Sequence, residues 1–137
     1  MTKVLQAASF SQMLAPSAAA TTVRTAALDT TGADYATIVV NFGIELNTNS
    51  TNVVVSISEG DTTNSFSTFN SDFNSITVDN VAATIATRHI DLKGRKRYLL
   101  LTVTPDSTTN GPVITSATGI MRKDRSPSSA ATNSVTG

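Results

Sequence analysis

The chain has 137 residues, with ten basic and ten acidic side chains and a formal net charge of zero. It contains no cysteine and one histidine, which excludes disulfide frameworks, cysteine-ligated zinc, iron–sulfur clusters, thiol chemistry and multi-histidine metal sites. Only 15% of the residues are charged, whereas 23 threonines and 16 serines give a surface rich in hydroxyl groups. This length indicates one domain, and a neutral, charge-poor surface favours a protein that lies against neighbours.

Residues 1–20 are interpreted as an N-terminal arm. Their apolar positions follow a loose helical spacing that Pro16 interrupts, and polar residues break the segment too often for a signal-peptide core. No run of residues approaches the ~18 apolar positions of a membrane span, so we expect no membrane partner. The arm requires a surface for its apolar side chains, and we expect these to contact partner chains: Val4, Leu5, Phe10, Met13 and Leu14.

From residue 21 onward the hydrophobic pattern has a period of two, which is typical of strands. The clearest strand covers residues 35–46, followed by a polar turn at 47–52. Its apolar side chains alternate strictly and predict a half-buried strand. Those on the buried face are Ile38, Val40, Phe42, Ile44 and Leu46.

A second strand is predicted at residues 53–58 and ends at the Glu-Gly-Asp sequence that follows. Residues 62–75 hold three phenylalanines among polar residues, and we expect a loop whose phenylalanine side chains plug one end of the core. A short strand follows at residues 76–79.

Two further strands, at residues 83–92 and 97–104, flank a Lys-Gly-Arg-Lys turn, and this pattern predicts a β-hairpin. The last predicted strand covers residues 113–121. Residues 122–137 are polar and contain a proline, so we interpret them as a C-terminal tail.

These elements amount to about seven strands with short turns and no long helix. The pattern predicts an all-β fold, an antiparallel β-sandwich of jelly-roll or immunoglobulin-like type. We expect an arm at 1–20, the sandwich domain at 21–121 and the tail at 122–137.

Few residues carry the patterns of an active site. His89 is the one imidazole and is interpreted as a partly exposed strand residue, and Glu45 and Glu59 as solvated strand ends. The Asp/Asn-containing segments 61–64 and 106–110 are interpreted as ordinary turns rather than calcium loops. There is no glycine-rich phosphate loop and no nucleophile elbow. We therefore expect no enzyme, no cofactor and no metal.

Charge is distributed unevenly along the chain. Residues 1–80 hold two basic and seven acidic side chains, and residues 81–137 hold eight basic and three acidic ones. The basic residues cluster at 93–97, which we call the basic run, and at 122–125. These clusters are interpreted as a solvated turn and tail, as a contact with acidic patches on another chain, or as a nucleic-acid site. A neutral total disfavours nucleic acid. Under the contact interpretation the basic residues that meet a partner are Lys93, Arg95, Lys96, Arg97, Arg122, Lys123 and Arg125.

Three stretches carry a resemblance to a known group of proteins: DTTGADYATIVV (29–40), SEGDTTN (58–64) and DLKGRKRYLLLTVTP (91–105). Together they resemble small β-rich proteins encoded beside the major capsid protein in tailed bacteriophages. The resemblance implies a capsid decoration or cement protein, a homotrimer that clamps neighbouring subunits of the major capsid protein. It also implies a location on the capsid surface of the virion after assembly in the host cytoplasm, and it transfers no site residue.

Two other classes of function stay open on the sequence. One is another virion component, such as a tail-tube, adaptor or fibre domain. The other is a carbohydrate-binding or adhesin module, in which Tyr35 or Tyr98 would contact the glycan.

Overall fold

The computed structural model describes residues 8–19, 22–45, 51–69, 75–78, 82–106, 113–123 and 134–136. All regular structure in these ranges is β, as the period-two pattern predicts. The described strands are β1 (Ala8–Ala19), β2 (Arg24–Asp29), β3 (Tyr35–Glu45), β4 (Thr51–Thr62), β5 (Ser65–Thr68), β6 (Ser75–Val78), β7 (Thr84–Asp91), β8 (Tyr98–Asp106), β9 (Val113–Arg122) and β10 (Ser134–Thr136).

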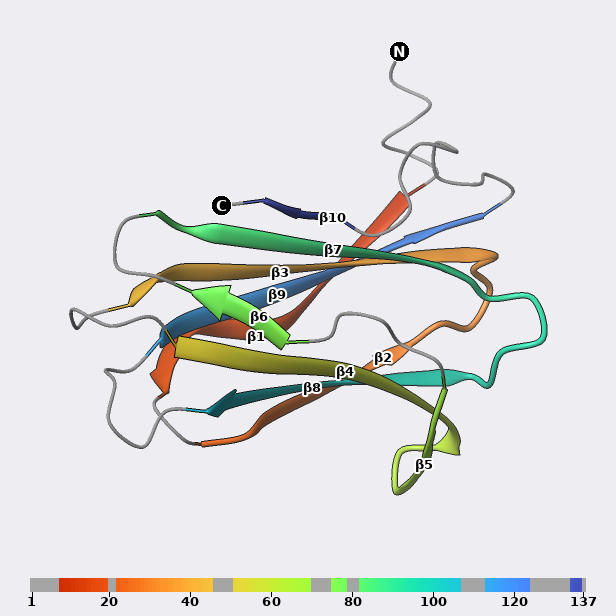
Figure 1. The fold of residues 1–137 in the computed structure, drawn as a ribbon. Helices are drawn as coiled ribbons and strands as arrows, with labels where there is room; N and C mark the ends of the chain where they lie inside the picture. Colours follow the sequence, from red (N-terminus) through yellow and green to blue (C-terminus); the bar gives the residue numbers. More distant parts are fainter. Residues whose placement is uncertain are drawn as a thin grey trace, which may run out of the picture.

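The strands form two antiparallel sheets that pack face to face, so the predicted β-sandwich is confirmed (Figure 1). The first sheet has the order β1-β9-β3-β7-β10, and the second has the order β2-β8-β4-β5, with β6 also paired to β4. The described ranges hold ten strands rather than about seven. The strands that the sequence analysis did not place are β1, β2, β5 and β10.

The core lies between the sheets and consists of alternate side chains from each strand, because successive residues of a strand point to opposite faces. In β3 the buried set includes Ile38, Val40 and Phe42, as the alternation predicts. The remaining members from the central strands are Ala36, Val53, Val55, Ile57, Ala86, Ile90, Leu99, Leu101, Val103 and Ala117.

Residues 8–19 are an edge strand of the sandwich and not an arm outside it, so the expected domain start at residue 21 is wrong. β1 pairs with β9 from Ala8 to Ala19, with two register shifts around Leu14. The guanidinium of Arg24 donates to the carbonyl oxygens of Ala15 and Thr115 at 2.6 Å each, and so binds carbonyls beside the second shift. The shifts hide the period-two pattern, and Pro16 is tolerated because the strand lies at an edge.

The connection between β7 and β8 is not a hairpin, which corrects the expectation for residues 83–104. β7 pairs with β3 and β10 in the first sheet, whereas β8 pairs with β2 and β4 in the second. The chain therefore crosses from one sheet to the other. Leu92 is buried at the crossing and its N–H donates to the carbonyl of Asp34, which anchors the corner to the β2–β3 turn.

Two further segments differ in part from the expectations. β4 continues through Glu59 and forms a short hairpin with β5, in place of a loop from residue 62. Phe69, after this hairpin, packs against the core as expected for a phenylalanine plug. In the tail, Arg122 belongs to β9 and residues 134–136 pair with β7, so the sandwich also extends past residue 121.

The charged end of the sandwich as the candidate functional site

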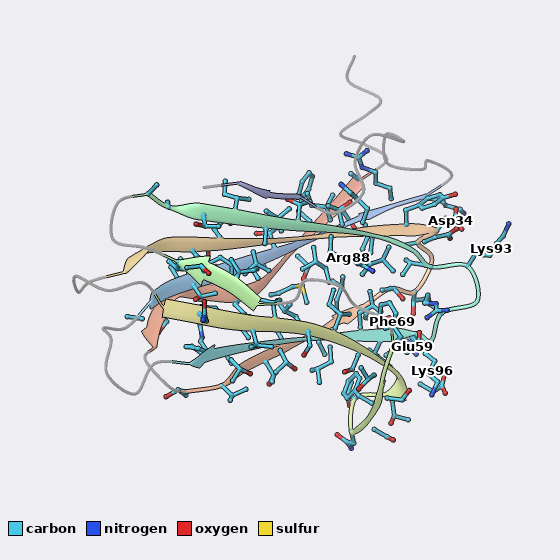
Figure 2. All side chains as sticks on the ribbon, viewed as in Figure 1. Asp34, Glu59, Phe69, Arg88, Lys93 and Lys96 are labelled. Carbon is cyan, nitrogen blue, oxygen red and sulfur yellow. The ribbon has the colours of Figure 1, made fainter. Side chains whose placement is uncertain are left out.

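Charged side chains gather at one end of the sandwich. Strand register brings this end together, because Tyr98 lies opposite both Asp29 and Gly60, and Tyr35 lies opposite both Asp91 and Arg122. Figure 2 shows Asp34, Glu59, Lys93 and Lys96 at this end. We call it the charged end, and its charged residues are Asp29, Asp34, Glu59, Asp61, Asp91, Lys93, Arg95, Lys96, Arg97, Arg122 and Lys123.

The β2–β3 turn is built by short-range hydrogen bonds and one glycine. The carboxylate of Asp29 accepts from the N–H and the hydroxyl of Thr31, at 3.0 and 2.7 Å. Gly32 adopts φ of +79°, a left-handed conformation that residues with a Cβ rarely adopt. Thr30 is buried and donates its N–H and hydroxyl to the carbonyl of Arg97, so this turn is tied to the β7–β8 connection.

The β7–β8 connection is built in a similar way. Asp91 accepts from the N–H of Lys93 at 2.9 Å, and Gly94 adopts φ of +75°. The N–H of Arg95 donates to the carbonyl of Leu92 at 2.9 Å. The turn chemistry expected from the Lys-Gly-Arg-Lys sequence is therefore present, although it turns the chain between sheets.

Arg97 forms a two-point contact with Asp29. Its Nε and Nη2 atoms donate to the two carboxylate oxygens at 3.1 and 2.7 Å. Hydrogen bonding from Arg97 holds the pKa of Asp29 well below its usual range, and hydrogen bonds from Thr31 act in the same direction. The guanidinium also lies 4.9 Å from the ring centre of Tyr98, which orients it further.

Glu59 contacts two other residues of the basic run, Arg95 and Lys96. Its carboxylate lies 3.6 Å from Arg95 and accepts from the N–H of Lys96 at 3.3 Å. The Glu59 side chain is only 14% exposed, so the expectation of a solvated strand end is wrong for this residue. The guanidinium of Arg95 covers the Phe69 ring at 5.1 Å, and the ammonium of Lys96 lies 3.8 Å from the carboxylate of Asp61.

The opposite charges of the two halves of the chain therefore meet within one molecule. Arg95, Lys96 and Arg97 each face an acidic side chain from residues 1–80. The three sequence stretches that carry the phage resemblance, 29–40, 58–64 and 91–105, come together here.

Other residues expected at a partner surface occupy different environments. Leu14 is 6% exposed and belongs to the core of its own chain, so its expected role as an intermolecular contact is corrected. Met13 packs partly against the same core, whereas Phe10 is 59% exposed. Lys93 and Lys123 are exposed and Arg122 is half-buried. Val4, Leu5 and Arg125 lie outside the described residues.

His89 lies in β7 and projects from the outer face of the first sheet, as a partly exposed strand residue. Its Nδ1 atom is 2.8 Å from the hydroxyl of Thr37 on β3, directly opposite in the register. Desolvation lowers the pKa of His89, and the positive charge of Arg122 adds to this effect. The pair with Thr37 is a cross-strand contact, whereas desolvation and the charge of Arg122 keep the imidazole neutral over a wider pH range.

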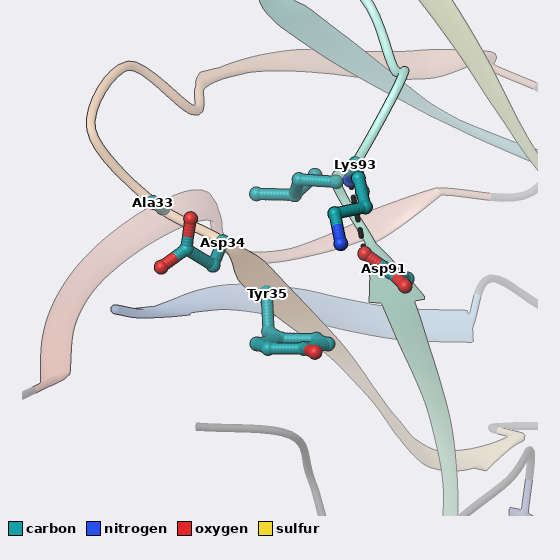
Figure 3. Close-up of a pocket in the computed structure, with 6 residues that line it drawn as sticks. Ala33, Asp34, Tyr35, Asp91 and Lys93 are labelled. Carbon is teal, nitrogen blue, oxygen red and sulfur yellow. Dashed lines mark hydrogen bonds between the residues drawn. The ribbon is translucent and has the colours of Figure 1, made fainter. Parts of the chain in front are cut away.

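Pockets open at the charged end. One of about 420 Å³ lies between the β2–β3 turn and the end of β7, and Figure 3 shows Asp34, Tyr35, Asp91 and Lys93 around it. A second, of about 370 Å³, is lined by Phe69, Arg88 and Arg95 among others. The sequence indicated Tyr35 only as a possible glycan contact and did not indicate that Asp91 lies beside it, because that proximity depends on the pairing of β3 with β7.

The broad outer faces of both sheets contrast with this end. On the first sheet, the outward positions from the row of Thr37 to the row of Asn41 hold no aspartate, glutamate, lysine or arginine, and they include Phe10 and Ile85 at 59% and 44% exposure. Others on this face are Gln12, Val39, Asn41, Thr87, Ser116, Thr118 and Ile120. On the second sheet the outward positions between the row of Asn52 and the row of Gly60 hold Thr25, Ala27, Val54, Ser56, Ser58, Leu100, Thr102 and Thr104.

No protein-family model and no sequence among the curated proteins matches this chain. Within the described ranges, no three histidine, aspartate or glutamate side chains are grouped so that they could hold a metal ion. The same part of the chain holds no helix with the length and hydropathy that crossing a membrane requires.

Proposed function

We propose that this chain is a structural protein of a phage virion, which decorates the capsid and stabilises it by bridging neighbouring subunits. The observation that carries the proposal is the separation of charge from the broad faces. Most of the charged groups in the described ranges lie at one end and many pair there, whereas the middle of each outer sheet face presents mainly hydroxyl and aliphatic side chains. The resemblance of three stretches to phage decoration proteins supports the same function.

An uncharged sheet face is suited to a protein contact because little charge must lose its hydration when the contact forms. Exposed aliphatic and aromatic side chains gain from burial at roughly 25 cal/mol per Å². Ion pairs at the exposed rim of a contact stabilise it less, because a surface ion pair contributes about 0–1 kcal/mol. The basic residues 95–97 already face acidic partners in their own chain, so we assign the main contact to a face.

The outer face of the first sheet is the better candidate of the two. Phe10 is the most exposed large apolar side chain among the described residues, and it lies opposite Ile120 in the register. Val39 and Ile85 extend the same face across β3 and β7. Burial of this face against a capsid subunit or another copy would stabilise the closed shell, because anything that binds only the assembled state lowers its free energy.

The test is cosedimentation of the purified protein with shells of the phage that encodes it. We expect saturable binding and a higher temperature of shell disruption for the natural sequence. Phe10→Ser should weaken binding. The matched control is Val54→Ser, because Val54 is an exposed apolar residue on the second sheet, and this variant should bind as the natural chain does. Absence of cosedimentation would contradict the proposal, and loss of binding by Val54→Ser alone would move the contact to the other face.

The proposed partners are other copies of this chain, as a trimer, and the major capsid protein. Native mass spectrometry of the free protein and counting of copies on the shell distinguish this assembly from a tail-tube or fibre component. A trimer with fixed occupancy on capsids supports decoration, whereas a hexameric ring or a stacked rod supports the other virion classes.

A further inference from the structure

The pocket beside Tyr35 combines an aromatic ring with hydrogen-bonding groups of both kinds. Its described lining comprises Ala33, Asp34, Tyr35, Asp91, Leu92 and Lys93. In Figure 3 the side chain of Lys93 extends into the space between the two aspartates, and the Tyr35 ring is seen nearly edge-on below that space. One face of the ring is therefore turned toward the pocket.

Main-chain contacts hold this lining in place. Asp34 donates its N–H to the carbonyl of Arg122 at 2.9 Å and accepts from the N–H of Leu92 at 3.0 Å. Asp91 accepts from the N–H of Lys93. Tyr35 lies between β9 and β7 in the first sheet and is half-buried. A pocket whose walls are fixed before binding loses little entropy when a ligand enters.

The charges select the chemical class of the ligand. The ammonium of Lys93 would repel a free cation, and the carboxylates of Asp34 and Asp91 would repel a free anion. A neutral ligand with several hydroxyl groups satisfies both, because hydroxyls donate to carboxylates and accept from an ammonium. The exposed face of a tyrosine ring also suits the C–H face of a pyranose. The volume, about 420 Å³, is within the usual range for small-molecule sites.

We propose that this pocket binds a neutral saccharide unit of a glycan. Tyr35 forms the floor under the sugar ring, Asp34 and Asp91 accept from its hydroxyls, and Lys93 donates to another hydroxyl. The pocket is open at the end of the sandwich, so a single site binds weakly. Several copies displayed on one surface would strengthen attachment through multivalency. This proposal does not depend on capsid decoration, since the pocket belongs to one chain.

The test is a titration of isotopically labelled protein with methyl glycosides of glucose, galactose, rhamnose and N-acetylglucosamine, followed by NMR. A glycan array probed with the tetramerised protein extends the set of sugars. We expect at least one sugar to shift the resonances of Ala33, Leu92 and Lys93 saturably. Tyr35→Ala should weaken this binding about tenfold or more, because the stacking surface is lost, whereas Tyr35→Phe should retain it.

Lys93→Ala is a second variant that is safe for folding, since Lys93 is exposed. It should weaken sugar binding with an unchanged melting temperature. Lys123→Ala and Tyr98→Ala are matched controls outside this pocket and should bind normally. The proposal is overturned if no sugar shifts the pocket resonances, if both Tyr35→Ala and Lys93→Ala bind as the natural chain does, or if a lysine-rich peptide binds there and no sugar does.

Discussion

Replacement of Leu14 by alanine tests whether β1 belongs to the core of its own chain. Leu14 is 6% exposed and packs between the sheets, whereas Phe10, four residues earlier on the same strand, is 59% exposed. If β1 were an arm that is ordered only on a partner, truncation at either position would leave the stability of the isolated protein nearly unchanged. The structure instead requires a large difference between the two positions.

The magnitude follows from burial. Leucine-to-alanine changes in cores lower the free energy of unfolding by about 2–5 kcal/mol. We expect about 2–3 kcal/mol for Leu14→Ala, because an edge strand can relax around the smaller side chain. With a urea m-value of about 1.5 kcal/mol per molar, the midpoint of unfolding should fall by about 1.3–2 M. Phe10→Ala should change the free energy of unfolding by no more than about 0.5 kcal/mol, because the ring is mostly solvated already.

The assay is urea unfolding of the purified protein followed by circular dichroism at several protein concentrations. Concentration independence shows that the transition reports the single chain. Equal, small effects of Leu14→Ala and Phe10→Ala would refute the placement of β1 in the core.

Three further predictions concern the β4–β5 hairpin, the charged end and His89. Gly60→Ala should lower the melting temperature and disrupt the β4–β5 hairpin, because an added Cβ overlaps the carbonyl oxygen of Ser65; heteronuclear NMR of that segment checks it. Arg97 lowers the pKa of Asp29 in the folded chain, so the stability from this contact is present above the usual pKa of 3.8 and is lost as the pH falls below it. Thermal melts should show that the Asp29→Asn variant does not lose this part of its stability in acid. The pKa of His89 is also lowered by folding, so protonation favours the unfolded chain and stability should fall as the pH drops through 6.5; His89→Gln should remove that slope, and a slope that persists would contradict it.

Regular strands could be predicted from the sequence because one face of each is buried. The alternation through Ile38, Val40 and Phe42 is strict, since β3 lies in the middle of its sheet with one side on the core. The same holds for the predicted strands that became β4, β7, β8 and β9.

β1 could not be predicted because its register shifts break the alternation. Met13 and Leu14 are adjacent, and both contact the core, which no regular strand permits. The pattern then imitates helical spacing. A long-range interaction, the contact of Arg24 with the carbonyls of Ala15 and Thr115, stabilises this irregular strand.

The β7–β8 connection shows a second limit of local patterns. A glycine with positive φ suits a hairpin and also a corner between sheets, so Gly94 does not distinguish them. The partners of β7 and β8 decide the outcome, and these lie far away in sequence. For the same reason the sequence revealed the basic run but not its acidic partners, Asp29 and Glu59.

Cryo-electron microscopy of the shell that we propose as its partner, assembled with and without this protein, is the decisive test of capsid decoration. We predict density for the sandwich with the outer face of β1, β9, β3 and β7 against a capsid subunit or a second copy, and with the charged end open to solvent. A shell without such density, or a sandwich whose Phe10 face points to bulk solvent, would contradict the proposed decoration.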